Sequence, residues 1–171
     1  MRAIRHPGPP LEPRLLTARS DTSTEFAIDL GAGADLLATL AEALERLGVD
    51  TAGVRFAGGN LDRIGFVTGV PDPTGYRIAT HSAPTYLDGP IVLIGGSAIL
   101  GRESADRLRL HCHAAFVAAD GTARSGHLLP GCCPVGTGGA CAFVTATGSA
   151  QFAVAFDPET NFPLLQPVAA A

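Results

Sequence analysis

Three histidines, His111, His113 and His127, stand in two short stretches that have the pattern of the arms of one β-hairpin. Residues i and i+2 of a strand point to the same face, so His111 and His113 project together. The Ala-Asp-Gly at residues 119–121 predicts a three-residue hairpin loop, with Gly121 in the left-handed conformation that such a loop requires. Counting outward from this loop places His113 directly opposite His127.

Three imidazoles on one face match the three-protein-ligand arrangement that leaves the fourth position of a metal ion open. Neutral imidazole nitrogens suit zinc, or another divalent transition metal, better than magnesium or calcium. This interpretation depends on the loop length, because a two-residue loop would turn His127 to the opposite face. The alternative is that the three histidines are ordinary polar residues of a half-exposed sheet.

The composition narrows the class of protein. The chain of 171 residues is long enough for one domain with a real core, and 46% of it is hydrophobic while only 16% is charged. This low charge density favours an assembly in which apolar surface is buried against other copies. All twelve basic residues are arginine, which excludes a Walker-type phosphate loop and lysine Schiff-base chemistry. The net charge of −4 disfavours general binding of duplex DNA.

Targeting and cysteine patterns point to the cytoplasm. No apolar run is long enough to span a membrane, and prolines interrupt the N-terminal segment where a signal peptide would need its apolar core. The four cysteines include no Cys-x-x-Cys pair, so no structural zinc knuckle is expected. We expect a cytoplasmic protein with reduced thiols and no membrane contact.

One early helix and many strands are expected. Residues 35–47 place Leu36, Leu40, Leu44 and Leu47 on one stripe, and Gly48 supplies the stop. Strands are expected at 25–30, 54–57, 64–70, 76–80, 90–100, 107–118, 122–129 and 140–156, with turns or loops at 58–60, 71–75, 81–89 and 131–139. This order predicts an α+β fold whose body is a largely antiparallel, barrel-like sheet. The expected boundaries are a flexible, basic, proline-rich arm at 1–20, a single domain at 21–158 and a C-terminal tail at 159–171.

The order of these parts resembles the PPC ("plants and prokaryotes conserved") domain. The hallmark of that family is a strand of the form His-x-His-x-x-x-x-x-x-Asp-Gly followed by Gly-Gly-His-Leu. Here the first motif runs from His111 to Gly121, and the second stands as Ser125-Gly126-His127-Leu128. Residues 53–69, which include Gly58-Gly59-Asn60-Leu61-Asp62, look like the family's Gly-Ala-Val/Leu turn and strand, and the resemblance covers about residues 24–156.

The resemblance implies a compact α+β domain that assembles as a homotrimer. It also implies zinc on the three hairpin histidines, as in several prokaryotic members, whose stand-alone forms often carry the name "putative DNA-binding protein". The Arg-Gly-Arg-Pro hook with which plant members enter the minor groove does not occur in this sequence. We therefore expect direct DNA binding to be weak or absent.

Two functions of a metal site remain open at this point, beside a structural alternative in which the histidines only tie the sheet together and trimer contact is the whole function. The first is a homotrimeric, zinc-binding module with a regulatory or binding role. The second is a zinc-dependent lyase or hydrolase acting on a small carbonyl-containing substrate, since an open zinc position can polarise a carbonyl or activate water. Such an enzyme needs further groups near the metal, and the candidates are Arg55, Asn60, Asp62, Arg109 and Glu103.

Overall fold

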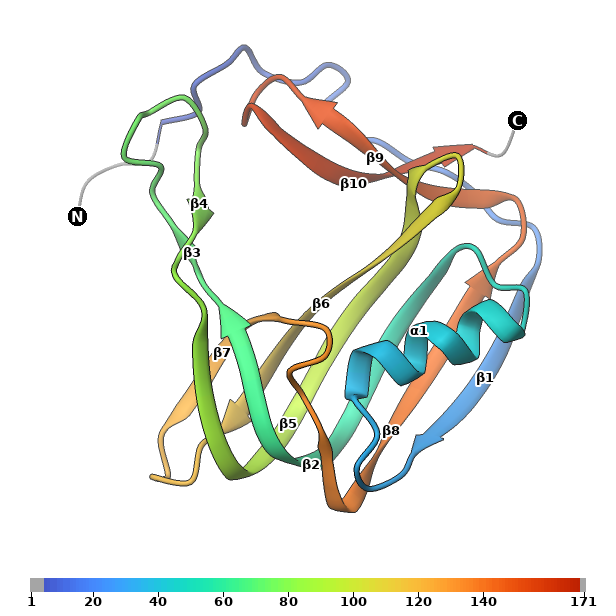
Figure 1. Cartoon of the computed structure of the whole chain (residues 1–171). Coiled ribbons are helices and arrows are strands. Elements are labelled where there is room, and N and C mark those ends of the chain that lie inside the picture. Colours follow the sequence, from blue (N-terminus) through green and yellow to red (C-terminus); the bar gives the residue numbers. More distant parts are fainter. Residues whose placement is uncertain (1–4, 170–171) are drawn as a thin grey trace.

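The computed structural model describes residues 5–169 as one eight-stranded mixed sheet, a small two-stranded sheet and one early helix (Figure 1). In chain order the elements are β1 (Ser23–Leu30), α1 (Leu36–Arg46), β2 (Ala52–Val67), β3 (Gly69–Val70), β4 (Thr80–His81), β5 (Thr85–Ser104), β6 (Arg107–Val117), β7 (Ala123–Leu128), β8 (Val135–Thr147), β9 (Ala150–Asp157) and β10 (Phe162–Ala169). Within this part of the chain, no helix has the length and apolar character needed to cross a membrane.

Four strands close into a ring. β2 pairs with β5, β5 with β6, β6 with β7, and β7 returns to β2, each pair being antiparallel. β8 and β1 extend the sheet from β2, while the β9–β10 hairpin joins β5 through one parallel contact between Arg102 and Ala153. The predicted fold class is therefore confirmed: a largely antiparallel, barrel-like body with one early helix.

The helix covers the core at the β1 side of the sheet (Figure 1). Asp35 caps its N-terminus, because the Asp35 Oδ1 accepts hydrogen bonds from the backbone N–H groups of Leu37 and Ala38 at 3.1 and 2.9 Å. Gly48 ends it with a φ of 68°. Leu36, Leu37, Leu40 and Leu44 are buried as predicted, whereas Leu47 is 50% exposed because it lies at the C-cap.

Several expected boundaries are wrong. Of the strand expected at 76–80, only Thr80 belongs to a strand, the short β4. The expected turn at 58–60 is a bulge inside the continuous strand β2, where Gly58 and Gly59 have φ values of 108° and 142°. A Cβ at Gly59 would lie 2.7 Å from the Cβ of Ala140, so close packing against β8 requires glycine there. The expected loop at 81–89 is mostly the first part of β5, and the expected long strand at 140–156 is divided at Gly148 into β8 and β9.

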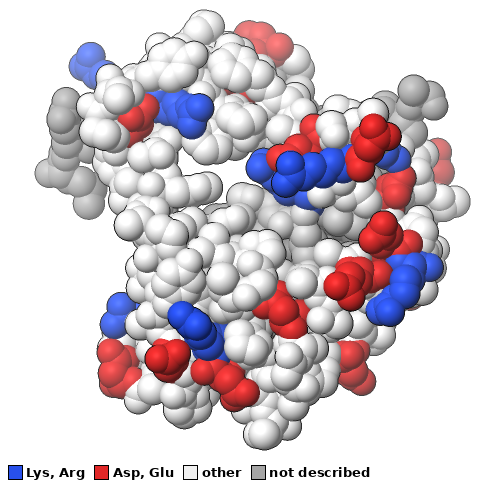
Figure 2. Space-filling model, in the orientation of Figure 1, with Lys and Arg blue, Asp and Glu red and all other residues white. Residues whose placement is uncertain are grey.

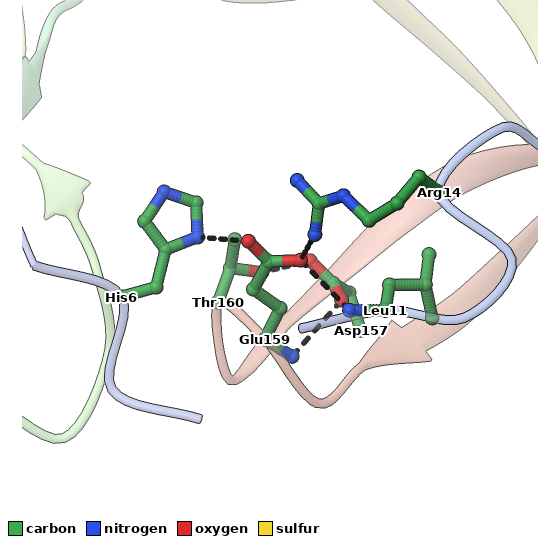
Figure 3. A network of polar contacts seen from close by, with 6 residues as sticks. All are labelled: His6, Leu11, Arg14, Asp157, Glu159 and Thr160. Carbon is green, nitrogen blue, oxygen red and sulfur yellow. Dashed lines mark hydrogen bonds and ion pairs between the residues drawn. The ribbon is translucent and has the colours of Figure 1, made fainter. Parts of the chain in front are cut away.

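The interpretation of residues 159–171 as a tail is also wrong, because Phe162–Ala169 pairs along its length with β9. The described part of the N-terminal arm, residues 5–20, has no helix or strand and lies against the β9–β10 turn. Figure 3 shows the contact: the Glu159 carboxylate accepts from the His6 ring at 2.8 Å, from the Leu11 backbone N–H at 2.8 Å and from Arg14. The arm thus holds the turn between β9 and β10 in place.

Candidate metal centre

The β6–β7 hairpin has the register that the histidine spacing predicts. The Ala118 N–H donates to the Thr122 carbonyl at 3.0 Å, the Asp120 Oδ1 accepts from the Thr122 N–H at 2.9 Å, and Gly121 has a φ of 79°. These contacts define a three-residue loop. His113 is consequently the direct partner of His127 across the two strands, which confirms the predicted pairing.

The three imidazoles converge on one point of the outer face of the ring. Each offers a ring nitrogen, and the three nitrogens lie within 4.8 Å of one another. The ring centroids are 4.4 Å apart for His111 and His127, 4.8 Å for His111 and His113, and 5.3 Å for His113 and His127. The Nε2 atoms of His111 and His113 approach to 2.9 Å. The cluster could bind one metal ion.

The cluster also contains an unpaired buried nitrogen. Among the described residues, no group hydrogen-bonds the buried Nδ1 of His127. Buried polar atoms almost always have a partner, because leaving one without it costs the full desolvation penalty. A donor set of three imidazoles with one such unpaired nitrogen fits a borderline divalent cation.

The electrostatic environment keeps two of the imidazoles neutral. Burial lowers the pKa of His111 from 6.5 to about 4, and the nearby positive charges of His113, Arg109 and His81 act in the same direction. Burial likewise lowers the pKa of His127 to about 4, and the neighbouring His111, His113, His81 and Arg109 act in the same direction. Only the neutral imidazole offers a lone pair to a metal, so both rings are in the binding form near pH 7.

Comparison with known families identifies the domain. The model of the Plants and Prokaryotes Conserved (PCC, or PPC) domain matches residues 18–152, which is more than two thirds of the chain. The chain belongs to this family. No curated protein sequence matches it.

Solved PPC structures share the fold at low sequence identity. A plant- and prokaryote-conserved protein from Pyrococcus horikoshii is 16% identical, with a TM-score of 0.70 over 90% of this chain and 99% of that one. A metal-containing protein from Archaeoglobus fulgidus is 20% identical, with a TM-score of 0.61 over 88% and 97%. A protein from Ralstonia eutropha JMP134, described as a "putative DNA-binding protein", is 18% identical, with a TM-score of 0.64 over 81% and 88%.

Two cavities adjoin the histidines of this PPC domain. One of about 480 Å³ lies beside His113 and His127, next to β3 and β4. The other, which we name the arginine cavity, has a volume of about 670 Å³ and is lined by His111 and His127, by Glu103 and Arg109, and by β10. A ligand or substrate could approach a bound metal from either side.

His81 lines both cavities, although no pattern in the sequence singles it out. Its ring stacks on that of His127 with a centroid distance of 5.5 Å and an interplanar angle of 8°. The rings of Phe162 and His81 form a T-shaped pair with a centroid distance of 6.4 Å. Because His81 stands alone on the short strand β4, only the tertiary fold brings it to the metal cluster.

The candidate neighbours fall into two groups. Arg109 shares a strand and a face with His111 and lines the arginine cavity together with Glu103. Arg55 is on the same face, opposite Ser97, which itself faces His113. Arg55 is thus two strands from the metal cluster, about 10 Å at the usual strand spacing.

Asn60 and Asp62 lie elsewhere. They stand at the bulge of β2 beneath the start of β8, where a Cβ on Gly136 would lie 2.8 Å from the Asp62 Oδ1 and 3.2 Å from the Asn60 side chain. Neither these two residues nor Arg55 is among the described residues that line the two cavities.

Proposed function

We propose that this PPC domain binds one zinc ion on His111, His113 and His127 and acts as a homotrimeric binding module. The observation that carries this proposal is the convergence of three imidazole nitrogens within 4.8 Å on a rigid hairpin. When bound, the metal would supply a Lewis-acidic position open to a fourth ligand, because the protein provides three. The metal-containing relative from Archaeoglobus fulgidus supports the proposal.

The trimer part of the proposal is supported by apolar side chains on the outer face of the sheet. Val92 and Ile94 on β5 are 55% and 58% exposed, and Phe143 on β8 is 43% exposed. Burial of such side chains between copies is favourable by roughly 25 cal/mol per Å² of apolar surface. Light scattering of the purified protein at micromolar concentration should give the mass of three chains, and a stable monomer would contradict this part of the proposal.

Direct DNA binding is proposed to be weak or absent. Figure 2 shows Arg side chains interspersed with Asp and Glu over the visible face, without a continuous basic stripe. Arg63, Arg102 and Arg124 each form an ion pair with an aspartate. Duplex binding driven by phosphate contacts needs unpaired basic groups and depends steeply on salt. A tight, salt-sensitive complex with AT-rich duplex would overturn this statement.

A zinc-dependent lyase or hydrolase is the second candidate function. The observation that favours it is the arginine cavity, which brings a cationic side chain and room for a small molecule beside His111 and His127, two of the residues that would hold the metal. Turnover of a small carbonyl compound by the zinc-loaded protein, lost in His113→Ala, would favour the enzyme over the binding module.

The metal content of two matched variants tests the principal proposal. Zinc-loaded wild type, dialysed and measured by elemental analysis, should retain one zinc per chain. His113→Ala should lose most of it, because His113 contacts both other ligands. His6→Ala is the control. The His6 side chain is half exposed and pairs with the Glu159 carboxylate at the turn between β9 and β10. Circular dichroism should show that both variants fold. Equal zinc in wild type and His113→Ala would mean that these are ordinary sheet histidines.

A further inference from the structure

The arginine cavity has one net positive charge before any metal is bound. Glu103 is its only carboxylate among the described lining residues, and two arginines hold it: Arg109 Nη2 at 2.7 Å from Oε1 and Arg107 Nε at 2.8 Å from Oε2. Two cations therefore face one anion. A divalent metal on the neutral histidines would add two further positive charges, so the cavity favours an anionic ligand.

Arg109 is placed to receive such a ligand. It precedes His111 by two residues on β6, so both side chains point to the same face. Its pairing with Glu103 occupies one terminal nitrogen, and a guanidinium has five N–H donors in a planar fork that matches a carboxylate. Glu103 thus positions Arg109 while leaving donors for a second anion. The Arg109 side chain is 43% exposed and can be reached from the cavity.

The opposite wall of the cavity is apolar. Phe162, Leu164 and Leu165 of β10 face it, and Ile99 of β5 lies beside His111 on the sheet. Leu164 is 41% exposed although it lines a cavity, so it presents apolar surface to whatever enters. Figure 2 shows the charged side chains grouped near the ends of β5 and β6, next to a largely uncharged hollow.

Size and chemistry together define a ligand class. A volume of about 670 Å³ lies in the range of small-molecule pockets, which combine apolar walls with a few polar groups that fix orientation. We propose that the arginine cavity binds a small organic carboxylate with an apolar body. Its carboxylate lies between Arg109 and the open position of the metal, and its apolar part lies along β10. The metal end of this assignment rests on the proposed zinc site.

Octanoate is a suitable probe, and acetate and octanol are its partial analogues. Zinc-loaded full-length protein of measured zinc content is titrated with each by calorimetry. Octanoate should bind at one per chain and at least about tenfold more tightly than acetate, because it buries six more methylene groups in the cavity and each adds to the hydrophobic driving force. Octanol, which has the same apolar body without the charge, should bind at least about tenfold more weakly than octanoate.

Two arginine variants distinguish recognition of the carboxylate by Arg109 from a general effect of removing one positive charge. Arg109→Gln should weaken octanoate binding about tenfold, the usual effect of losing a charge-assisted hydrogen bond. Arg124→Gln is the matched control: Arg124 lies on the same hairpin, is 38% exposed and pairs with Asp120, but does not line the cavity. It should leave octanoate affinity within about twofold of wild type. Both variants should retain the zinc of the wild type.

A third variant tests the apolar wall that β10 contributes to the cavity. Leu164→Asp puts a carboxylate on β10 at an exposed position, so the fold should tolerate it, and it should also weaken octanoate binding by about tenfold or more.

Unchanged affinity in Arg109→Gln, an equal loss in Arg124→Gln, or no octanoate binding by zinc-loaded wild type would each overturn the carboxylate assignment. If wild type takes up no zinc, the proposed function fails, and the same titrations of Arg109→Gln and Arg124→Gln still decide the carboxylate subsite.

Discussion

The affinity of the histidine cluster for zinc should fall much less between pH 7 and pH 5 than three solvated histidines would allow. Protons compete with the metal for the imidazole lone pairs, so each ligand lowers the apparent affinity once the pH falls below its pKa. For a free imidazole with a pKa of 6.5, the loss at pH 5 is about 1.5 decades, so three such ligands would lose about 4.5 decades. That sum is what independent, solvated histidines would show.

The structure predicts a much smaller loss. Because burial lowers the pKa of His111 and His127 to about 4, each ring is neutral in about nine tenths of the molecules at pH 5. Protonation of each of these two rings then lowers the apparent affinity at pH 5 by less than about 0.1 decade, whereas protonation of a solvated imidazole would lower it by about 1.5 decades. The total loss between pH 7 and pH 5 should therefore be about three decades smaller than for three solvated histidines, and the contribution of His111 and His127 should become steep only as the pH approaches 4.

Competition with a chromophoric zinc chelator of known proton affinity measures this directly. The apparent dissociation constant is determined at half-unit steps from pH 7.5 to 4.5, with circular dichroism at each step to confirm that the protein is folded. A loss of three decades or more between pH 7 and pH 5 would refute the reasoning, because it would mean that His111 and His127 titrate as solvated groups.

Four further outcomes are expected. Deleting Ala119 shortens the hairpin loop to two residues, shifts the register by one and should abolish zinc binding, as dialysis would show. Metal-free protein should lose thermal stability as the pH falls from 6.5 towards 4, because the unfolded chain then binds protons that the buried rings of His111 and His127 do not. Asp35→Ala removes the helix cap and should lower the free energy of unfolding in urea by about 1 kcal/mol. Leu40→Ala should cost about 2–5 kcal/mol in the same assay, whereas Leu47→Ala, half exposed at the C-cap, should cost less than about 0.5 kcal/mol.

The sequence by itself determined the local features whose geometry depends on near neighbours. The period of two along a strand and the Ala-Asp-Gly loop are enough to bring His113 opposite His127, since a hairpin register is set by its turn. The helix was equally predictable from the sequence, because the Asp35 cap, the leucine stripe and Gly48 all lie within the helix or beside it. These features fixed both the candidate ligands and the fold class.

Only the tertiary structure decided what surrounds those ligands. His81 reaches His127 from β4, and Phe162 reaches His81 from β10, a segment whose short apolar run resembles a tail until its pairing with β9 is known. Such contacts join segments far apart in the chain, and no spacing rule predicts them. The bulge of β2 shows the same limit: Gly58-Gly59 has the composition of a turn, yet packing against β8 keeps the strand continuous.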